Sequence, residues 1–143
     1  MSVVKLLSRI VAPPIEEKMV SESAERTLHD HSYGITSDPL AQFACAISAM
    51  IHDVDHSGVP NAQLIKEKQR VAAAYNNKSV AEQNSVDLAW SLLMQDNFKD
   101  LRRAIYGTES EFRRFRQLIC NAVLATDIFD KDLGAQRKER WSK

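Results

Sequence analysis

The apolar residues of this 143-residue chain recur mainly with a helical period. In several segments they stand three and four positions apart, whereas alternating runs of β-branched residues, which indicate strands, are scarce. Only four glycines and four prolines interrupt these segments. The pattern therefore predicts an all-α fold, with enough sequence for one domain and a substantial core.

The clearest predicted helix begins near Leu40, and residues 40–51 contain no charged residue. Asp38 before it is a favourable N-cap, and Pro39 suits the first helical position. Apolar side chains cover both sides of this helix, as is typical of a helix buried all round. One side carries Leu40, Phe43, Ala44, Ile47 and Ile51, and the other carries Ala41, Cys45 and Ala49. We expect Gly58 and Pro60 to end it.

Two further helices are predicted to begin at capping boxes, in which a Ser or Thr N-cap is followed three residues later by Glu. Ser79 with Glu82 predicts one start, and Thr108 with Glu111 predicts the other. The apolar residues expected to be buried are Val86, Ala89, Trp90 and Leu93 in the first helix and Phe112, Phe115, Ile119, Ala122 and Val123 in the second. The second helix turns Arg113, Arg114 and Arg116 mostly toward solvent.

The two ends of the chain are less regular. Residues 2–11 predict an apolar helix that Pro13 and Pro14 would end. Residues 13–37 are polar and predict a loop that is long for a compact domain, with a short helix left open near residues 23–28. The tail KDLGAQRKERWSK predicts a polar, helical end.

Charge and cysteine content narrow the classes of partner. Nineteen Lys and Arg balance nineteen Asp and Glu, which removes the general electrostatic attraction to nucleic acid or anionic membranes. No apolar run approaches the roughly 18 residues that span a bilayer, so no direct membrane insertion is expected. Cys45 and Cys120 both fall in apolar helical patterns, which indicates buried free thiols in an intracellular protein.

The segment IHDVDHSGVPN, residues 51–61, concentrates possible metal ligands. Its Asp, Ser and Gly spacing matches the opening of a calcium-binding EF-hand loop. That loop needs a bidentate Glu at its twelfth position, where this chain has Leu64. Calcium is therefore excluded, and the ligands to be explained are His52, Asp53, Asp55 and His56.

Three interpretations of this cluster remain. If the segment is helical, His52 and His56 share a face as in the zinc-protease motif H-E-x-x-H, although no third ligand follows. Alternatively, the adjacent His52 and Asp53 bind two metals of a phosphohydrolase, with Asp55 and His56 as supporting groups. Thirdly, the cluster merely caps a helix end, which would make its charges costly to bury.

Three blocks of the sequence resemble the class I 3′,5′-cyclic-nucleotide phosphodiesterases. IHDVDHSGVPN is similar to the signature H-D-x-D-H-x-G-x-x-N of that family, which Asn61 completes. AAAYNNKSVAEQ is similar to L-Y-N-D-x-S-V-L-E-N, and AVLATDI is similar to V-L-A-T-D-M. The blocks follow the order and spacing of the family, and the resemblance runs from about Leu6 to Asp127 apart from the loop. The sequence also resembles versions of this domain found in diatoms and related algae.

The resemblance implies a multi-helix, HD-type catalytic domain that hydrolyses cAMP or cGMP to the 5′-monophosphate. It implies two divalent cofactors, Zn²⁺ and Mg²⁺ or Mn²⁺, with His52 as a zinc ligand and Asp53 bridging the two ions. Supporting roles are implied for His56, Asn61, Glu82 and Asp127, of which Glu82 would contact waters on the second metal. The domain would act inside the cell, in the cytoplasm or on the cytoplasmic face of a membrane through a parent protein.

The chain departs from the family pattern near the proposed metals. Ser57 stands where the family usually has Pro. Gln83, Asn84 and Ser85 stand where the family has N-H-H, so a histidine partner close to the metal ligands is missing. The loop over residues 13–37 is also longer than the resemblance implies. These departures leave the preference between cAMP and cGMP open.

Two family motifs are not found in residues 1–143. The H-N-x-x-H-A motif, which carries the proton-donating histidine and a zinc ligand, has no match, because His29 and His31 fit no spacing of it. We expect both histidines to be solvated. The last ligand aspartate and the purine-gripping glutamine of the family would fall beyond Lys143.

We therefore expect residues 1–143 to be a central part of a catalytic domain. Such a chain would bind zinc weakly and show no measurable turnover alone, and would act with the remainder of a larger polypeptide or as a homo-oligomer. The alternative is a non-catalytic helical module that regulates or assembles other proteins on the same scaffold.

Overall fold

The computed structural model describes residues 26, 29–67, 70–130, 134–136 and 138–139, and the regular elements in these ranges are helices. The all-α prediction is confirmed. The predicted helix over residues 2–11 and most of the polar segment 13–37 lie outside the described residues. So does most of the tail, although residues 134–136 and 138–139 are helical as expected.

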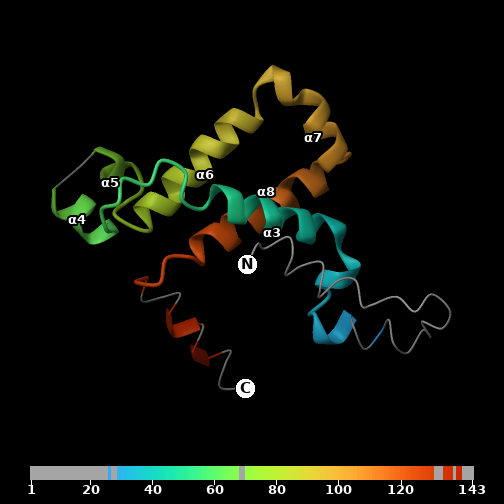
Figure 1. Ribbon diagram of the computed structural model, residues 1–143, viewed down its shortest axis with the longest axis horizontal. Helices are drawn as coiled ribbons and strands as arrows, with labels where there is room; N and C mark the ends of the chain where they lie inside the picture. Colours follow the sequence, from blue (N-terminus) through green and yellow to red (C-terminus); the bar gives the residue numbers. More distant parts are fainter. Residues whose placement is uncertain (1–25, 27–28, 68–69, 131–133, 137, 140–143) are drawn as a thin grey trace.

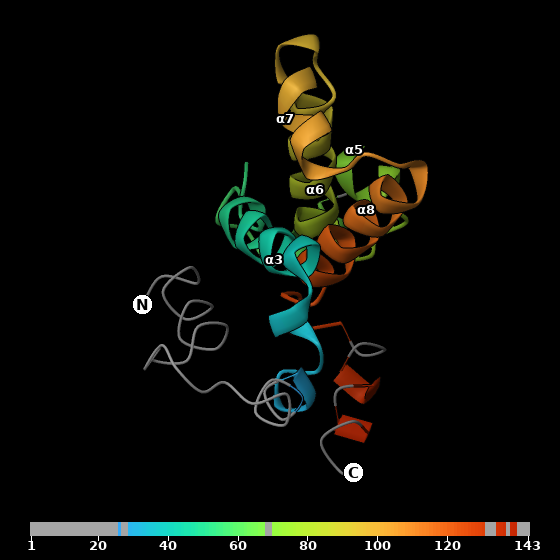
Figure 2. The same cartoon turned by 90° about the vertical axis from the view of Figure 1, so that its right-hand side faces the viewer.

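Three long helices form the body of the structure. Helix α3 (Pro39–Ile51) lies along α8 (Glu109–Leu124), and α6 (Val80–Leu93) packs against both (Figures 1 and 2). The short helix η1 (Ile35–Ser37) precedes α3. Other short helices connect the long ones: α4 (Asn61–Lys66) and α5 (Arg70–Ala74) lie between α3 and α6, and η2 (Asp96–Phe98) and α7 (Lys99–Ile105) lie between α6 and α8. The short helices were not predicted, because segments of one or two turns carry little periodic signal.

Helix α3 begins as predicted but ends early. The Asp38 carboxylate accepts a hydrogen bond of 3.1 Å from the Ala41 amide, and Pro39 occupies the first turn. The helix stops at Ile51 instead of continuing to Gly58, and residues 52–55 form a turn. Asp55 has a φ of 60°, a left-handed conformation that an α-helix cannot contain. The potential metal ligands therefore stand on a turn, not on a helical face.

The expectation that α3 is buried all round is wrong for the described part of the chain. Ala44 is 1% exposed against α8, but Met50 on another side is 76% exposed. An apolar groove of about 660 Å³ runs beside Met50, lined largely by side chains of α3 and α6. Within the described residues α3 therefore has packing partners on one side only. This could not be predicted from the sequence, because apolar residues occur on both sides of the helix.

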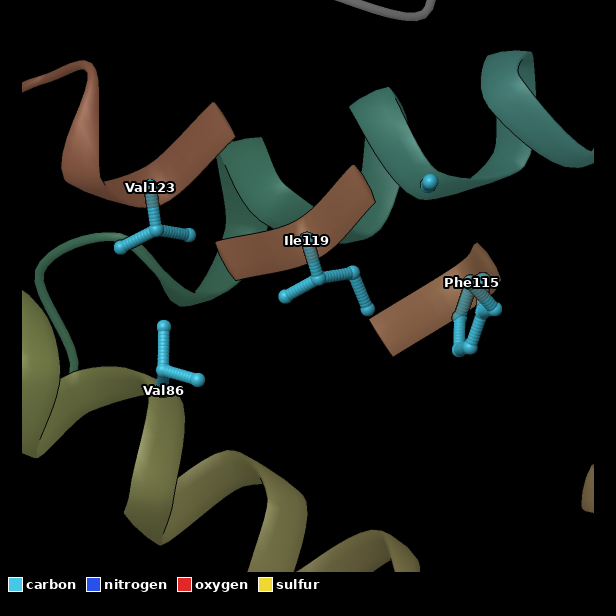
Figure 3. Packing of buried hydrophobic residues seen from close by; sticks show 5 residues of the cluster. Val86, Phe115, Ile119 and Val123 are labelled. Carbon is cyan, nitrogen blue, oxygen red and sulfur yellow. The ribbon is translucent and has the colours of Figure 1, made fainter. Parts of the chain in front are cut away.

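The core lies where α3, α6 and α8 meet. Phe115, Ile119 and Val123 follow one another along α8, with Val123 facing Val86 of α6 (Figure 3), and all four are buried in one cluster. This confirms the buried face predicted for α8, with Phe112 and Ala122 half-buried at its margins. A smaller cluster under α4 and α5 consists of Leu64, Ala72 and Val80.

The start of α8 is a capping box, as predicted. The Glu111 amide donates to Thr108 Oγ1 over 3.2 Å, and the Glu111 carboxylate accepts from the Thr108 amide over 3.0 Å. The same carboxylate accepts from the Gly107 amide, and this hydrogen bond is the main reason that the pKa of Glu111 is lowered.

The arginines of α8 are exposed, as expected, and each has a partner. Arg113 pairs with Glu109 over 2.9 Å, Arg114 pairs with Asp38, and the Arg116 guanidinium lies 5.6 Å from the centre of the Trp90 ring. These contacts favour a solvated face over a phosphate site.

The cysteines are free but only half-buried, so the prediction of buried thiols holds in part. Burial is still enough to raise the pKa of Cys120. None of the helices in the described ranges is long and apolar enough to cross a membrane.

Asp38 has two roles that two substitutions can separate. Asp38→Asn keeps an N-cap but removes the ion pair with Arg114, and should cost less than about 1 kcal/mol of unfolding free energy. Asp38→Ala removes both and should cost about 1–2 kcal/mol in urea denaturation. Equal losses from the two substitutions would show that the cap contributes nothing.

The same residue sets an acid dependence. The hydrogen bond from Arg114 holds the pKa of Asp38 below its ordinary value. Its contribution is therefore complete above about pH 4 and is lost as the pH falls through the lowered pKa. Denaturation curves between neutral and acidic pH should show a smaller acid-induced loss in Asp38→Asn than in the wild type. An identical loss would contradict this role for the pair.

Candidate metal-ligand turn and carboxylate network

The turn that follows α3 brings one imidazole and one carboxylate together. His52 Nε2 lies 3.0 Å from Asp53 Oδ2, and both side chains remain partly exposed. His52 Nδ1 lies 3.0 Å from the Ala49 carbonyl oxygen. A ring nitrogen that faces a carbonyl carries the proton, so in the neutral ring Nε2 presents its lone pair toward Asp53. A proton or a cation between Nε2 and the carboxylate would make this contact favourable.

The other two polar residues of the turn point elsewhere. His56 is exposed, and its Nδ1 accepts a hydrogen bond of 3.0 Å from the Gly58 amide. Asp55 Oδ2 accepts a hydrogen bond of 3.2 Å from Asn84 Nδ2 on α6. Because residues 52–55 are not helical, His52 and His56 do not share the helical face that the zinc-protease interpretation requires.

Helix α6 fixes this turn from one side. Ser85 Oγ donates a hydrogen bond of 2.7 Å to the Val54 carbonyl, next to the one from Asn84 to Asp55. Ser85 is fully buried, so its hydroxyl needs such a partner. In the sequence, positions 84 and 85 indicate only the loss of a histidine. The structure shows that both side chains contact the turn.

A second polar cluster is centred on Asn61, at the start of α4. Its Nδ2 lies 2.8 Å from Glu82 Oε2 and 3.4 Å from Asp127 Oδ2. Its Oδ1 accepts a hydrogen bond of 2.9 Å from the Ala81 amide. Because Ala81 lies in the first turn of α6, Asn61 satisfies an amide that a local N-cap would ordinarily satisfy.

The capping box predicted from Ser79 and Glu82 is therefore wrong, although α6 starts where expected. Ser79 has a φ of 38° and makes no capping hydrogen bond. Its Oγ donates over 2.8 Å to Asp127 instead, while Glu82 accepts from Asn61. Both side chains bind residues distant in the sequence and not the amides of the first turn of α6. A rule based on local spacing cannot predict such partners.

Asp127 is the buried acceptor of this network. It is 6% exposed, and its Oδ1 accepts a hydrogen bond of 3.0 Å from the Phe129 amide. Its Oδ2 accepts from Ser79 and from Asn61. A buried carboxylate needs donors of this kind, because burial strips its hydration. The network thus joins residues from three segments that lie far apart in the sequence.

The site residues predicted from the sequence fall into two groups. Asn61, Glu82 and Asp127 form one network, and His52 with Asp53 forms a separate pair on the turn. The His56 side chain accepts its hydrogen bond from the Gly58 amide and joins neither group. Asn84 and Ser85, which were not predicted to have a role, connect α6 to the turn that carries the pair.

The pair fits a divalent metal ion as part of a ligand set. Imidazole nitrogen and carboxylate oxygen are ligands that zinc accepts, and their 3.0 Å separation can be spanned by one ion with bonds of about 2.0–2.2 Å. A catalytic zinc site takes three protein ligands. Across the described residues no cluster of three or more His, Cys, Asp or Glu is placed to hold a metal.

Comparison with known proteins identifies a family for most of the chain. The model of a family described as "3′5′-cyclic nucleotide phosphodiesterase" matches residues 19–132. A Caenorhabditis elegans protein named "Probable 3′,5′-cyclic phosphodiesterase pde-6" is 38% identical over 90 residues, which is 59% of this chain. The human "High affinity cAMP-specific and IBMX-insensitive 3′,5′-cyclic phosphodiesterase 8A" is 36% identical over 97 residues, or 65% of this chain.

A third relative matches over a longer stretch. The mouse "Dual specificity calcium/calmodulin-dependent 3′,5′-cyclic nucleotide phosphodiesterase 1C" is 30% identical over 119 residues, or 80% of this chain. The matched region is a small part of each relative, amounting to 11% of the first two proteins and 17% of the third.

The role of Asn61 in capping α6 can be measured by denaturation. Asn61→Ala leaves the Ala81 amide without its acceptor and removes the donor to two carboxylates, so it should lower the unfolding free energy by about 2–3 kcal/mol. Asn97→Ala, at an exposed position in η2, is the matched control and should change it by less than about 0.5 kcal/mol.

A double-mutant cycle tests the contact with Glu82 directly. Asn61→Ala and Glu82→Ala should be coupled by at least about 0.5 kcal/mol, because they form one hydrogen-bonded network. Additive effects, or an Asn61→Ala variant as stable as Asn97→Ala, would contradict the network.

Proposed function

The chain belongs to the 3′,5′-cyclic nucleotide phosphodiesterase family, and from this premise we propose that it is the part of a catalytic domain that carries two metal ligands and their support. The reaction proposed is hydrolysis of cAMP or cGMP to the 5′-monophosphate. The observation that carries the proposal is the convergence of three sequence blocks on Asn61, Glu82 and Asp127. These are the three blocks in which the chain resembles the family.

His52 and Asp53 are the proposed metal ligands. His52 would bind Zn²⁺ through Nε2, with its ring held by the Ala49 carbonyl at Nδ1. Asp53 would bridge to a second divalent ion, Mg²⁺ or Mn²⁺, since carboxylates suit the harder cations. Two such ions would supply Lewis-acid activation of water for displacement at phosphorus.

The remaining site residues would hold groups in position. Asn61 keeps the Glu82 carboxylate in one orientation, so that it can accept hydrogen bonds from ordered water. Asp127 accepts from the same Asn61 nitrogen and is itself held by the Phe129 amide. His56 would support the turn through its bond to the Gly58 amide.

The proposed setting is cyclic-nucleotide signalling inside the cell. The chain would act in the cytoplasm, or on the cytoplasmic face of a membrane through a parent protein. The remaining ligands would come from the rest of a larger polypeptide or from a second copy. The matched region covers only 9–17% of the first relatives found, which favours the larger polypeptide.

Zinc binding by the purified, tag-free chain tests the ligand pair. Because two protein ligands make an incomplete site, binding should be weak, and His52→Ala or Asp53→Ala should reduce Zn²⁺ affinity by at least about tenfold in calorimetric titration. His31→Ala, at an exposed histidine, should leave the affinity unchanged. We expect no 5′-monophosphate from cAMP or cGMP with this chain alone. Equal zinc affinity in all variants, or robust turnover by the chain, would contradict the proposal.

A chimera tests the catalytic role. In human phosphodiesterase 8A, the region matching this chain over 97 residues is replaced by the corresponding residues of this chain. We expect the chimera to hydrolyse cAMP, and His52→Ala within it to reduce kcat/KM by at least about 100-fold, as loss of a metal ligand should. A folded chimera without activity would favour the non-catalytic helical module.

A further inference from the structure

Two polar side chains of α6 bind adjacent positions of the turn that carries His52 and Asp53. Asn84 Nδ2 donates to the Asp55 carboxylate over 3.2 Å, and Ser85 Oγ donates to the Val54 carbonyl over 2.7 Å. Val54 and Asp55 directly follow Asp53 in the chain. The hydrogen bonds therefore act within two residues of the carboxylate of the pair.

The conformation of the turn requires such anchoring. Asp55 has a φ of 60°, which is unfavourable for a residue with a side chain and persists only where contacts around it compensate. The hydrogen bonds within the turn, from the Val54 amide to Ile51 and from the His56 amide to Asp53, are local. Asn84 and Ser85 add the contacts that tie it to a long helix of the core.

The two contacts are strengthened in different ways, the Ser85 contact by burial and the Asn84 contact by the charge of its acceptor. Ser85 is 0% exposed, so its hydroxyl has no alternative partner in solvent, and its hydrogen bond of 2.7 Å has the usual O–H···O length. Asn84 is half-buried and bonds a charged acceptor, which strengthens that hydrogen bond.

We propose that Asn84 and Ser85 are positioning residues for the His52–Asp53 pair. By fixing Val54 and Asp55 on α6, they set the orientation of the Asp53 carboxylate toward His52 Nε2 and thereby the affinity of the pair for a divalent ion. The metal-binding part of this inference rests on the proposed function. The orientation of the pair does not, because it is a property of the metal-free chain.

Variants of α6 separate positioning from stability. Asn84→Ala and Ser85→Ala each remove one hydrogen bond to the turn. Gln83→Ala is the matched control on the same helix, because Gln83 donates to the Lys78 carbonyl before α6 and not to the turn. Asn84→His keeps a nitrogen donor of the residue type found in the family pattern at this position, and should rescue the Asn84→Ala defect.

Two quantities are measured at a temperature where every variant is folded. The first is the set of ¹⁵N chemical shifts of the His52 ring in the metal-free chain, and the second is the Co²⁺ affinity obtained from visible absorption. Asn84→Ala and Ser85→Ala should shift the His52 ring signals and weaken Co²⁺ binding by about tenfold, as loss of an outer hydrogen bond does. Gln83→Ala and Asn84→His should keep both values of the wild type.

Each outcome decides the inference separately from the proposed function. Unchanged ring signals and Co²⁺ affinity in Asn84→Ala and Ser85→Ala, at whatever stability, would overturn it and leave the two residues with a structural role only. If the wild type binds no Co²⁺, the metal pair of the proposed function fails. The ring signals then still decide the inference, because shifts confined to the two turn variants support positioning, and shifts absent from them overturn it.

Discussion

The hydrogen bonds of one asparagine side chain hold together the segments of this structure that carry the proposed site residues. Asn61 accepts from the first turn of α6 and donates toward Glu82 and Asp127, so that one amide serves a helix end and two carboxylates. The carboxylate of Asp127 is almost fully buried and needs these donors. Removal of the amide would leave the Ala81 amide without its acceptor and would take one donor from both Glu82 and Asp127, so that α4, α6 and the segment after α8 would lose their shared hydrogen bonds.

Helix α6 then links this network to the turn after α3. Its first turn is held by Asn61, and its next residues, Asn84 and Ser85, hold Val54 and Asp55. The pair formed by His52 and Asp53 is thus supported by the same helix that carries Glu82. In a member of the cyclic nucleotide phosphodiesterase family, this arrangement places the proposed metal ligands and their supporting carboxylates on one scaffold. The packing of Phe115, Ile119 and Val123 holds α3, α6 and α8 together in one core.

The sequence was informative where local physics decides the structure. Asp38 with Pro39, and Thr108 with Glu111, mark helix starts correctly because their partners lie within one turn. The buried face of α8 follows from its amphipathic period. The same rules failed at Ser79 and Glu82, because residues 48 and 21 positions away, Asp127 and Asn61, bind these side chains more favourably than the local amides do. The early end of α3 depends on the left-handed Asp55, and α6 holds that residue from outside the segment.

Motif resemblance supplied what periodicity could not, namely that three distant blocks belong to one site. The resemblance assigned no role to Asn84 and Ser85. At these positions the chain differs from the family motif, and the motif alone does not show what the differing side chains contact.

The most direct test of this arrangement is a titration of the tag-free, ¹⁵N-labelled chain with Co²⁺, observed as paramagnetic broadening of the backbone amides. The account predicts broadening centred on residues 52–56 and the first two turns of α6, with α7 unaffected. Broadening centred on His29 and His31, or spread evenly over the exposed Asp and Glu residues, would contradict it.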